Sequence, residues 1–110
     1  DVFKLAVSSS TDDIDIVLRR AGMTPDQIDY YELHQANIRI IEMIRRFVRQ
    51  PQSKFPVNIE KYGNTSSATI PILLDELNRS NRLKEGDMIL MSAFGAGFTT
   101  GAVVLRWGKN

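Results

Sequence analysis

His34 is the single histidine among 110 residues and the side chain best suited to hydrogen-bond or acid–base chemistry. It follows a short aromatic run that ends at Leu33, and from Ile38 onward apolar residues recur at helical spacing. This pattern predicts that His34 lies at the C-terminal end of a strand, ahead of a helix that Asn37 caps. Reacting groups of α/β folds gather at such strand ends. A lone histidine is, however, more often a packed or surface residue than a catalyst.

Two later stretches have residue types suited to binding. The side-chain amide of Asn64 donates hydrogen bonds at any working pH, although asparagine after glycine is also a common turn residue. The glycine-rich residues 95–97 lead into an expected strand and not into a helix, which argues against a nucleotide phosphate loop. A bend of this composition instead favours close approach of the backbone to a ligand.

Three motifs follow one another along the chain: His34-Gln35-Ala36-Asn37, Tyr62-Gly63-Asn64-Thr65-Ser66 and Phe94-Gly95-Ala96-Gly97-Phe98-Thr99-Thr100-Gly101. With these motifs, in this order, the chain resembles the C-terminal part of beta-ketoacyl-acyl-carrier-protein synthase III, a condensing enzyme family of the thiolase-like superfamily that starts fatty-acid synthesis. The similarity runs along essentially the whole chain but covers only the last third of a full-length member. The resemblance implies an acyltransferase.

The resemblance also assigns catalytic roles. His34 and Asn64 would point together at a malonyl thioester and stabilise the negative charge that forms on its oxygen when carbon dioxide leaves. A cysteine in the other half of the enzyme would complete the triad and take an acyl group from acyl-coenzyme A. The backbone N–H of Ala96 would complete an oxyanion hole for the cysteine adduct. Most members have glycine where Ala96 stands.

Further residues acquire binding roles from the same resemblance. Phe94 would line the acyl site beside the cysteine, unless it is an ordinary core aromatic. Asn37 would meet the pantetheine arm in addition to capping its helix. Gln35 would buttress the turn at the docking site of the acyl carrier protein. Leu33 replaces a proline that many relatives have before the histidine.

The expected helix from Ile38 to about Gln50 has four arginines and a single glutamate, Glu42, a local charge of +3. Arg39, Glu42 and Arg46 share one face by helical spacing, and Arg49 is expected to continue that face. A solvated surface with a Glu42–Arg46 pair is the simplest interpretation. The resemblance instead implies docking of the acidic acyl carrier protein, since guanidinium groups suit phosphates and carboxylates. The arginines assigned to docking are Arg39, Arg45, Arg46 and Arg49.

Composition limits the classes of protein. With 43% hydrophobic and 25% charged residues, the chain is typical of one globular domain, residues 1–110. A net charge of +1 suggests neither a nucleic-acid nor a membrane partner. No apolar run approaches the length needed to cross a bilayer, and no leader peptide is evident. Without cysteine the chain alone offers no disulfide, thiolate metal site or thiol nucleophile. We expect a segment of a longer cytoplasmic protein that needs no cofactor or metal.

The remaining elements follow from hydrophobic periodicity and turn residues. We expect a layered α/β domain, the C-terminal half of a thiolase-like fold, with a mixed sheet covered by helices and its first strand missing. Glu32 is a charged residue in a strand expected to be buried on both faces, so we expect it at an edge position or with a partner. The expected elements are a helix at 2–21 ended by Gly22, a helical turn at 24–27, strands at 28–33 and 54–59, a helix capped by Ser66 or Ser67, a turn at 84–87, and strands at 88–92 and 100–107.

Two other functions are compatible with the sequence. The chain could be a non-catalytic module that docks acyl carrier protein or pairs with a cysteine-bearing subunit. It could also belong to another thiolase-like synthase, of the polyketide or hydroxymethylglutaryl type, which the combination of motifs disfavours. For the condensing enzyme the expected partners are acyl carrier protein, coenzyme A thioesters, the N-terminal half of the enzyme and, at full length, a second copy.

Overall fold

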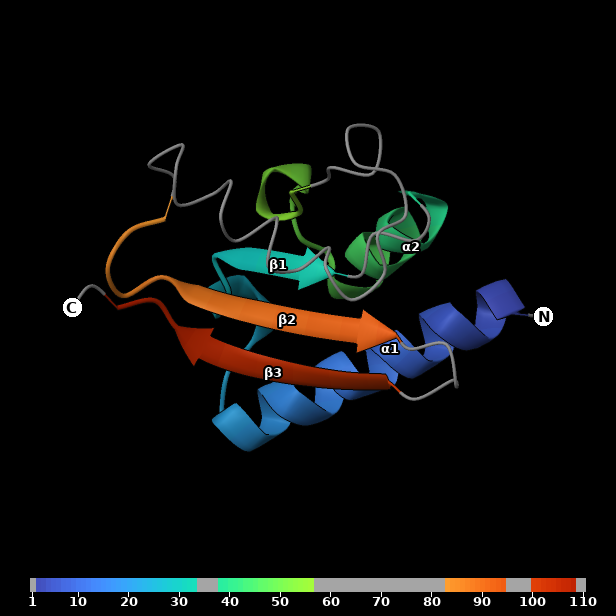
Figure 1. Ribbon diagram of the computed structural model, residues 1–110, viewed down its shortest axis with the longest axis horizontal. Helices are drawn as coiled ribbons and strands as arrows, with labels where there is room; N and C mark the ends of the chain where they lie inside the picture. Colours follow the sequence, from blue (N-terminus) through green and yellow to red (C-terminus); the bar gives the residue numbers. More distant parts are fainter. Residues whose placement is uncertain (1, 34–37, 57–82, 95–99, 109–110) are drawn as a thin grey trace.

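The computed structural model describes residues 2–33, 38–56, 83–94 and 100–108 (Figure 1). Within these described residues, neither α-helix is long and apolar enough to span a lipid bilayer. In chain order the described elements are helix α1 (Val2–Ala21), the 3-10 turn η1 (Pro25–Gln27), strand β1 (Tyr30–Leu33), helix α2 (Ile38–Val48), the 3-10 turn η2 (Gln52–Lys54), strand β2 (Met88–Phe94) and strand β3 (Thr100–Arg106).

The three described strands form one mixed sheet in the order β1-β2-β3. β1 runs parallel to β2, with Leu33 opposite Ser92, and β2 runs antiparallel to β3, with Phe94 opposite Thr100. Because β1 and β2 are parallel, their carboxyl ends lie at the same edge of the sheet. The mixed α/β sheet that the sequence predicts is confirmed.

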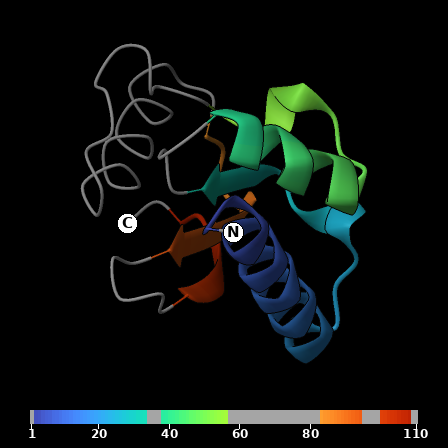
Figure 2. The ribbon, with the colours of Figure 1, turned by 90° about the vertical axis from the view of Figure 1, so that its right-hand side faces the viewer.

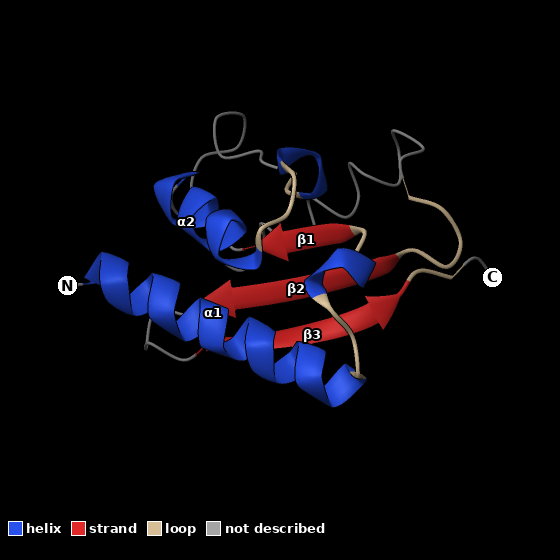
Figure 3. Cartoon of the chain, turned by 180° about the vertical axis from the view of Figure 1, so that it is seen from behind, coloured by secondary structure: helices blue, strands red, loops and turns tan. Residues whose placement is uncertain are grey.

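Both helices cover the same face of this sheet (Figures 2 and 3). Ile14 of α1 and Ile44 of α2 pack in one cluster with Tyr31 of β1 and Leu90 of β2. Residues that alternate with these along the strands form a second cluster, in which Ile89 is fully buried. Strand alternation therefore gives β2 two apolar faces, as expected for a strand covered on both sides, whereas the second face of β1 carries Glu32 beside Tyr30.

Helix α1 ends where the sequence predicts. Gly22 has a φ of +67°, and its N–H donates to Arg19 O at 3.1 Å. The N–H of Met23 donates to Leu18 O at 2.9 Å, which completes a glycine-dependent helix cap. The chain then enters η1, where Thr24 N–H donates to Gln27 Oε1 at 2.8 Å. The helix at 2–21 and the turn after it are both confirmed.

Other predicted boundaries need correction. β1 begins at Tyr30 and not at Ile28, and β2 continues to Phe94. The strand predicted at 54–59 is wrong over its described part, because Lys54 ends the turn η2. Phe55 after it is buried as a stacking partner of Tyr31, with ring centroids 4.7 Å apart. Residues 57–59 and the helix predicted after Ser66 lie outside the described residues.

Candidate functional site

The scaffold of the predicted catalytic site lies at the carboxyl ends of β1 and β2. β1 ends at Leu33, so His34 is the next residue in the chain, and β2 ends at Phe94, two residues before Ala96. These two strands are parallel neighbours, which brings both ends to one edge of the sheet. Phe94 is described as the last residue of β2. The predictions that lie outside the described residues concern His34, Gln35, Asn37, Asn64 and Ala96.

Tyr31 anchors β1 two residues before the carboxyl end of the strand. Its side chain is fully buried, and its hydroxyl donates to Pro25 O at 2.8 Å. Burial, and secondarily the negative charge of Asp26, raise the pKa of Tyr31 far above its usual value of 10.0. The hydroxyl therefore stays protonated and remains a donor. Together with the stacked ring of Phe55, this bond fixes β1 against η1 and η2.

Glu32 is a fully buried charged residue in the same strand. It lies opposite Met91 of β2, and β1 is an edge strand of the described sheet. An edge position is one of the two explanations that the sequence suggests for a carboxylate in this strand. By strand alternation Glu32 belongs to the same face as Tyr30, away from α1 and α2.

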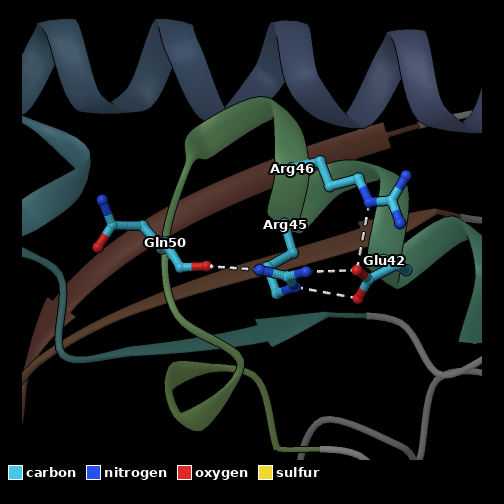
Figure 4. A network of polar contacts seen from close by, with 4 residues as sticks. All are labelled: Glu42, Arg45, Arg46 and Gln50. Carbon is cyan, nitrogen blue, oxygen red and sulfur yellow. Dashed lines mark hydrogen bonds and ion pairs between the residues drawn. The ribbon is translucent and has the colours of Figure 1, made fainter.

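The charged residues of α2 form a connected network (Figure 4). Glu42 accepts hydrogen bonds from Arg45 Nε at 3.0 Å, from Arg45 Nη2, and from Arg46 Nε at 3.4 Å. The contact with Arg45 lowers the pKa of Glu42 and raises the pKa of Arg45. The Glu42–Arg46 pair predicted from spacing is present, but the pair with Arg45, three residues along, has the better geometry.

The four arginines differ in their surroundings. Arg39 and Arg46 are exposed on α2, whereas Arg45 is partly buried and its Nη1 donates to Gln50 O at 3.1 Å. The prediction that Arg49 continues the helical face is wrong, because α2 ends at Val48. Arg49 has a φ of 58°, so helical spacing no longer describes its direction.

Phe47 belongs to the apolar residues that recur at helical spacing after Ile38. It is nevertheless 58% exposed, and Met43, one turn earlier, is 44% exposed. The buried positions of α2 are Ile41, Ile44 and Val48. The surface of α2 therefore combines arginines with an exposed apolar pair, which suits a partner with both acidic and apolar groups.

Gln50 is a buried polar residue that the sequence reasoning missed. Its Nε2 donates to Asp26 Oδ1 at 2.6 Å, and its Oε1 accepts from Lys54 Nζ at 2.8 Å. Lys54 Nζ also donates to Asp26 O at 3.1 Å. These bonds join the end of α2 to η1, the turn that leads into β1. A glutamine just after a helix end gives no sequence signal for such a contact.

A shallow polar pocket of about 260 Å³ lies at the opposite edge of the sheet. It is near the amino ends of β1 and β2, and therefore away from the strand ends that precede His34 and Ala96. The pocket does not coincide with the predicted catalytic site. Its lining residues are Asp29, Tyr30, Ser53, Lys54, Lys84 and Asp87.

Comparison with known proteins identifies the relatives of this chain. Residues 18–107 match the family model described as "3-Oxoacyl-[acyl-carrier-protein (ACP)] synthase III C terminal". The beta-ketoacyl-[acyl-carrier-protein] synthase III of Clostridium novyi (strain NT) is 48% identical over 107 residues, which are 97% of this chain and 33% of that protein. The chain thus spans about a third of the length of the curated relatives that it matches.

Solved structures of relatives resemble this chain in both sequence and fold. The crystal structure of 3-oxoacyl-[acyl-carrier-protein] synthase III from Aquifex aeolicus VF5 has a TM-score of 0.94 and 46% identity, over 96% of this chain and 34% of that one. The corresponding protein from Thermus thermophilus has a TM-score of 0.94 and 42% identity, over 99% and 34%. The described mixed sheet with its covering helices is therefore that of the C-terminal half of this thiolase-like fold. The chain belongs to the 3-oxoacyl-[acyl-carrier-protein] synthase III family and corresponds to its C-terminal part.

Proposed function

We propose that the protein containing this chain joins an acyl group from acyl-coenzyme A to malonyl-acyl carrier protein, with loss of carbon dioxide, to give 3-oxoacyl-acyl carrier protein. Family membership is the observation that carries the proposal. The parallel pairing of β1 and β2 supports it, because the strands that precede His34 and Ala96 end at one edge of the sheet. The reaction would initiate fatty-acid synthesis.

The chemistry divides between this chain and the rest of the protein. Since this chain has no cysteine, a cysteine thiolate from elsewhere in the protein attacks the acyl thioester, and coenzyme A leaves as its thiolate. The malonyl group then loses carbon dioxide, and its electron pair forms an enolate whose oxygen accepts hydrogen bonds from His34 and Asn64. The enolate carbon attacks the acyl-enzyme, and the backbone N–H of Ala96 stabilises the tetrahedral oxyanion before the cysteine leaves.

Other residues bind and orient the substrates in this scheme. Phe94 lines the acyl site, and Asn37 contacts the pantetheine arm. Acidic residues of the carrier protein dock on α2 and its end, at Gln35 and at the arginines. The full-length protein would act as a cytoplasmic homodimer without a metal or cofactor. The docking arginines are Arg39, Arg45, Arg46 and Arg49.

The test uses the full-length protein and separates the two half-reactions. In His34→Ala and Asn64→Ala variants we expect condensation and malonyl decarboxylation to fall about 10²–10³-fold, the effect of removing one oxyanion donor. Formation of the acyl-enzyme from acetyl-coenzyme A, followed by intact-protein mass spectrometry, should remain. Arg20→Ala, an exposed change near the end of α1, is the control and should alter neither step.

The arginines of α2 also favour a second candidate, a module that docks carrier protein without catalysis. The same assays distinguish it. If His34→Ala and Asn64→Ala leave condensation at the level of the unaltered full-length protein, these residues are not catalytic, and the docking module becomes the better description.

A further inference from the structure

A carboxylate lies within the arginine cluster of α2 (Figure 4). Glu42 accepts from Arg45 through both of its oxygens, and its Oε1 also accepts from Arg46 Nε at 3.4 Å. One acidic side chain therefore serves two guanidinium groups. Each of these groups is a planar fork that would suit a carboxylate or phosphate of an acidic partner equally well.

Arg45 and Arg46 differ in exposure and in how many hydrogen bonds within the chain hold their guanidinium groups. The side chain of Arg45 is 25% exposed, and it is held by Glu42 and by Gln50 O. The side chain of Arg46 is 70% exposed, and within the described part of the chain its one contact is the 3.4 Å bond through Nε. None of the described residues accepts from its two Nη groups, so the outer edge of this fork is available for a partner.

We propose that Glu42 is an internal competitor of the acidic carrier protein: it withholds Arg45 from docking and weakens Arg46. The inference rests on the proposed function for the identity of the partner and narrows its set of docking arginines, because Arg45 would bind carrier protein only when Glu42 no longer holds it. An exposed ion pair stabilises the fold little, so an incoming anion can exchange with Glu42 at Arg46. At Arg45 the exchange is harder, because the carboxylate binds through both oxygens and the backbone of Gln50 holds the same guanidinium.

A matched ion pair exists elsewhere on the chain. Asp15 and Arg19 of α1 form an exposed i,i+4 pair, with Arg19 Nη2 3.0 Å from Asp15 Oδ2. Asp15→Asn removes the same unit of negative charge as Glu42→Gln but leaves α2 unchanged. The comparison therefore separates a local competition on α2 from a general increase in positive charge.

The experiment is a titration of labelled holo acyl carrier protein into the full-length protein at low and high salt. Glu42→Gln should tighten docking about fivefold at low salt, the effect of removing one unit charge a few ångströms from a partner charge in water. The gain should shrink at high salt, where ions screen it. Asp15→Asn should change the affinity by less than about twofold, because its charge lies on another helix.

Arginine labelling with phenylglyoxal, resolved by peptide sequencing, tests whether carrier protein binds the guanidinium group of Arg45 or that of Arg46. In the unaltered protein, carrier protein should protect Arg46 and leave the labelling of Arg45 unchanged. In Glu42→Gln it should protect Arg45 as well. A change in total charge alone would not alter which arginines are protected.

Four results would overturn the inference. If only total charge mattered, Glu42→Gln and Asp15→Asn would change the affinity for carrier protein equally, and equal effects would therefore contradict a local competition on α2. Equal protection of Arg45 and Arg46 in the unaltered protein would show that Arg45 is not withheld. Failure of the unaltered protein to bind carrier protein at all would overturn the partner in the proposed function, and this inference with it; binding with no response to Glu42→Gln would overturn this inference alone.

Discussion

At the scale of single residues, the hydroxyl of Tyr31 is the contact that joins β1 to the turn before it. Tyr31→Phe keeps the ring stacked on Phe55 but removes the bond to Pro25 O. We expect the free energy of unfolding to fall by about 1 kcal/mol at neutral pH, the usual value for one hydrogen bond. Urea unfolding of the full-length protein, followed by fluorescence, measures the change.

The pH dependence of this difference follows from the raised pKa of Tyr31. The folded state holds the phenol proton more tightly than the unfolded state, so the stabilisation is fully present below the unfolded pKa of about 10. It is lost as the pH rises from there toward the higher folded pKa. The stability gap between the unaltered protein and Tyr31→Phe should therefore narrow above pH 10, and a constant gap would contradict the assignment. Phe55→Leu, which keeps the hydroxyl, should retain the alkaline slope.

At the scale of elements, Gly22 decides where α1 stops. Its φ of +67° lies in the left-handed region, and a Cβ built there meets no atom within 4 Å. Gly22→Ala should therefore cost about 1–2 kcal/mol of stability through backbone strain alone, with no steric clash to relieve. Thermal unfolding measures it, and a loss below about 0.5 kcal/mol would show that the chain leaves the helix by another route. Gly108→Ala is the matched control, because its site is equally open and its φ is not left-handed.

The elements that the sequence predicts correctly are those marked by a local signal. Gly22 ends α1, Thr24 and Pro25 start η1, and Gly86 with a φ of +91° forms the turn before β2. These residues act through their own backbone preferences, so no knowledge of the rest of the fold is needed. This is why the sequence correctly predicts the end of α1, the start of η1 and the turn before β2.

The failures come from contacts between distant parts of the chain. Phe55 is buried by stacking on Tyr31, so an apolar residue that suggested a strand belongs to a loop. Gln50 donates a hydrogen bond to Asp26, 24 positions away in the sequence, and no local sequence pattern predicts that bond. Phe47 is exposed because the buried side of α2 passes through Ile44 and Val48. Tertiary packing overrides periodicity at each of these positions.

At the scale of the whole molecule, the family and the sheet could be predicted from three motifs in order, whereas the convergence of His34 and Asn64 stays a prediction. The structure describes β1 and β2, which lead to His34 and Ala96, and leaves these residues outside the described part. His34 and Asn64 are thirty residues apart in the sequence, so only tertiary structure can bring these two proposed donors together. The half-reaction assays with His34→Ala and Asn64→Ala test whether both residues act in the same step, as that convergence requires.

The division of the proposed active site gives the last prediction. The 110-residue chain contains the two proposed decarboxylation donors, His34 and Asn64, but no cysteine, so it offers no thiolate to accept the acyl group. The pure chain should therefore show neither acyl transfer nor condensation with acetyl-coenzyme A and malonyl-acyl carrier protein, under conditions in which the full-length protein is active. The same chain with His34→Ala, purified in parallel, measures the background from contaminating host enzyme. Turnover above that background would mean that this segment catalyses without the cysteine, and the covalent mechanism would have to be replaced by direct transfer between the two thioesters.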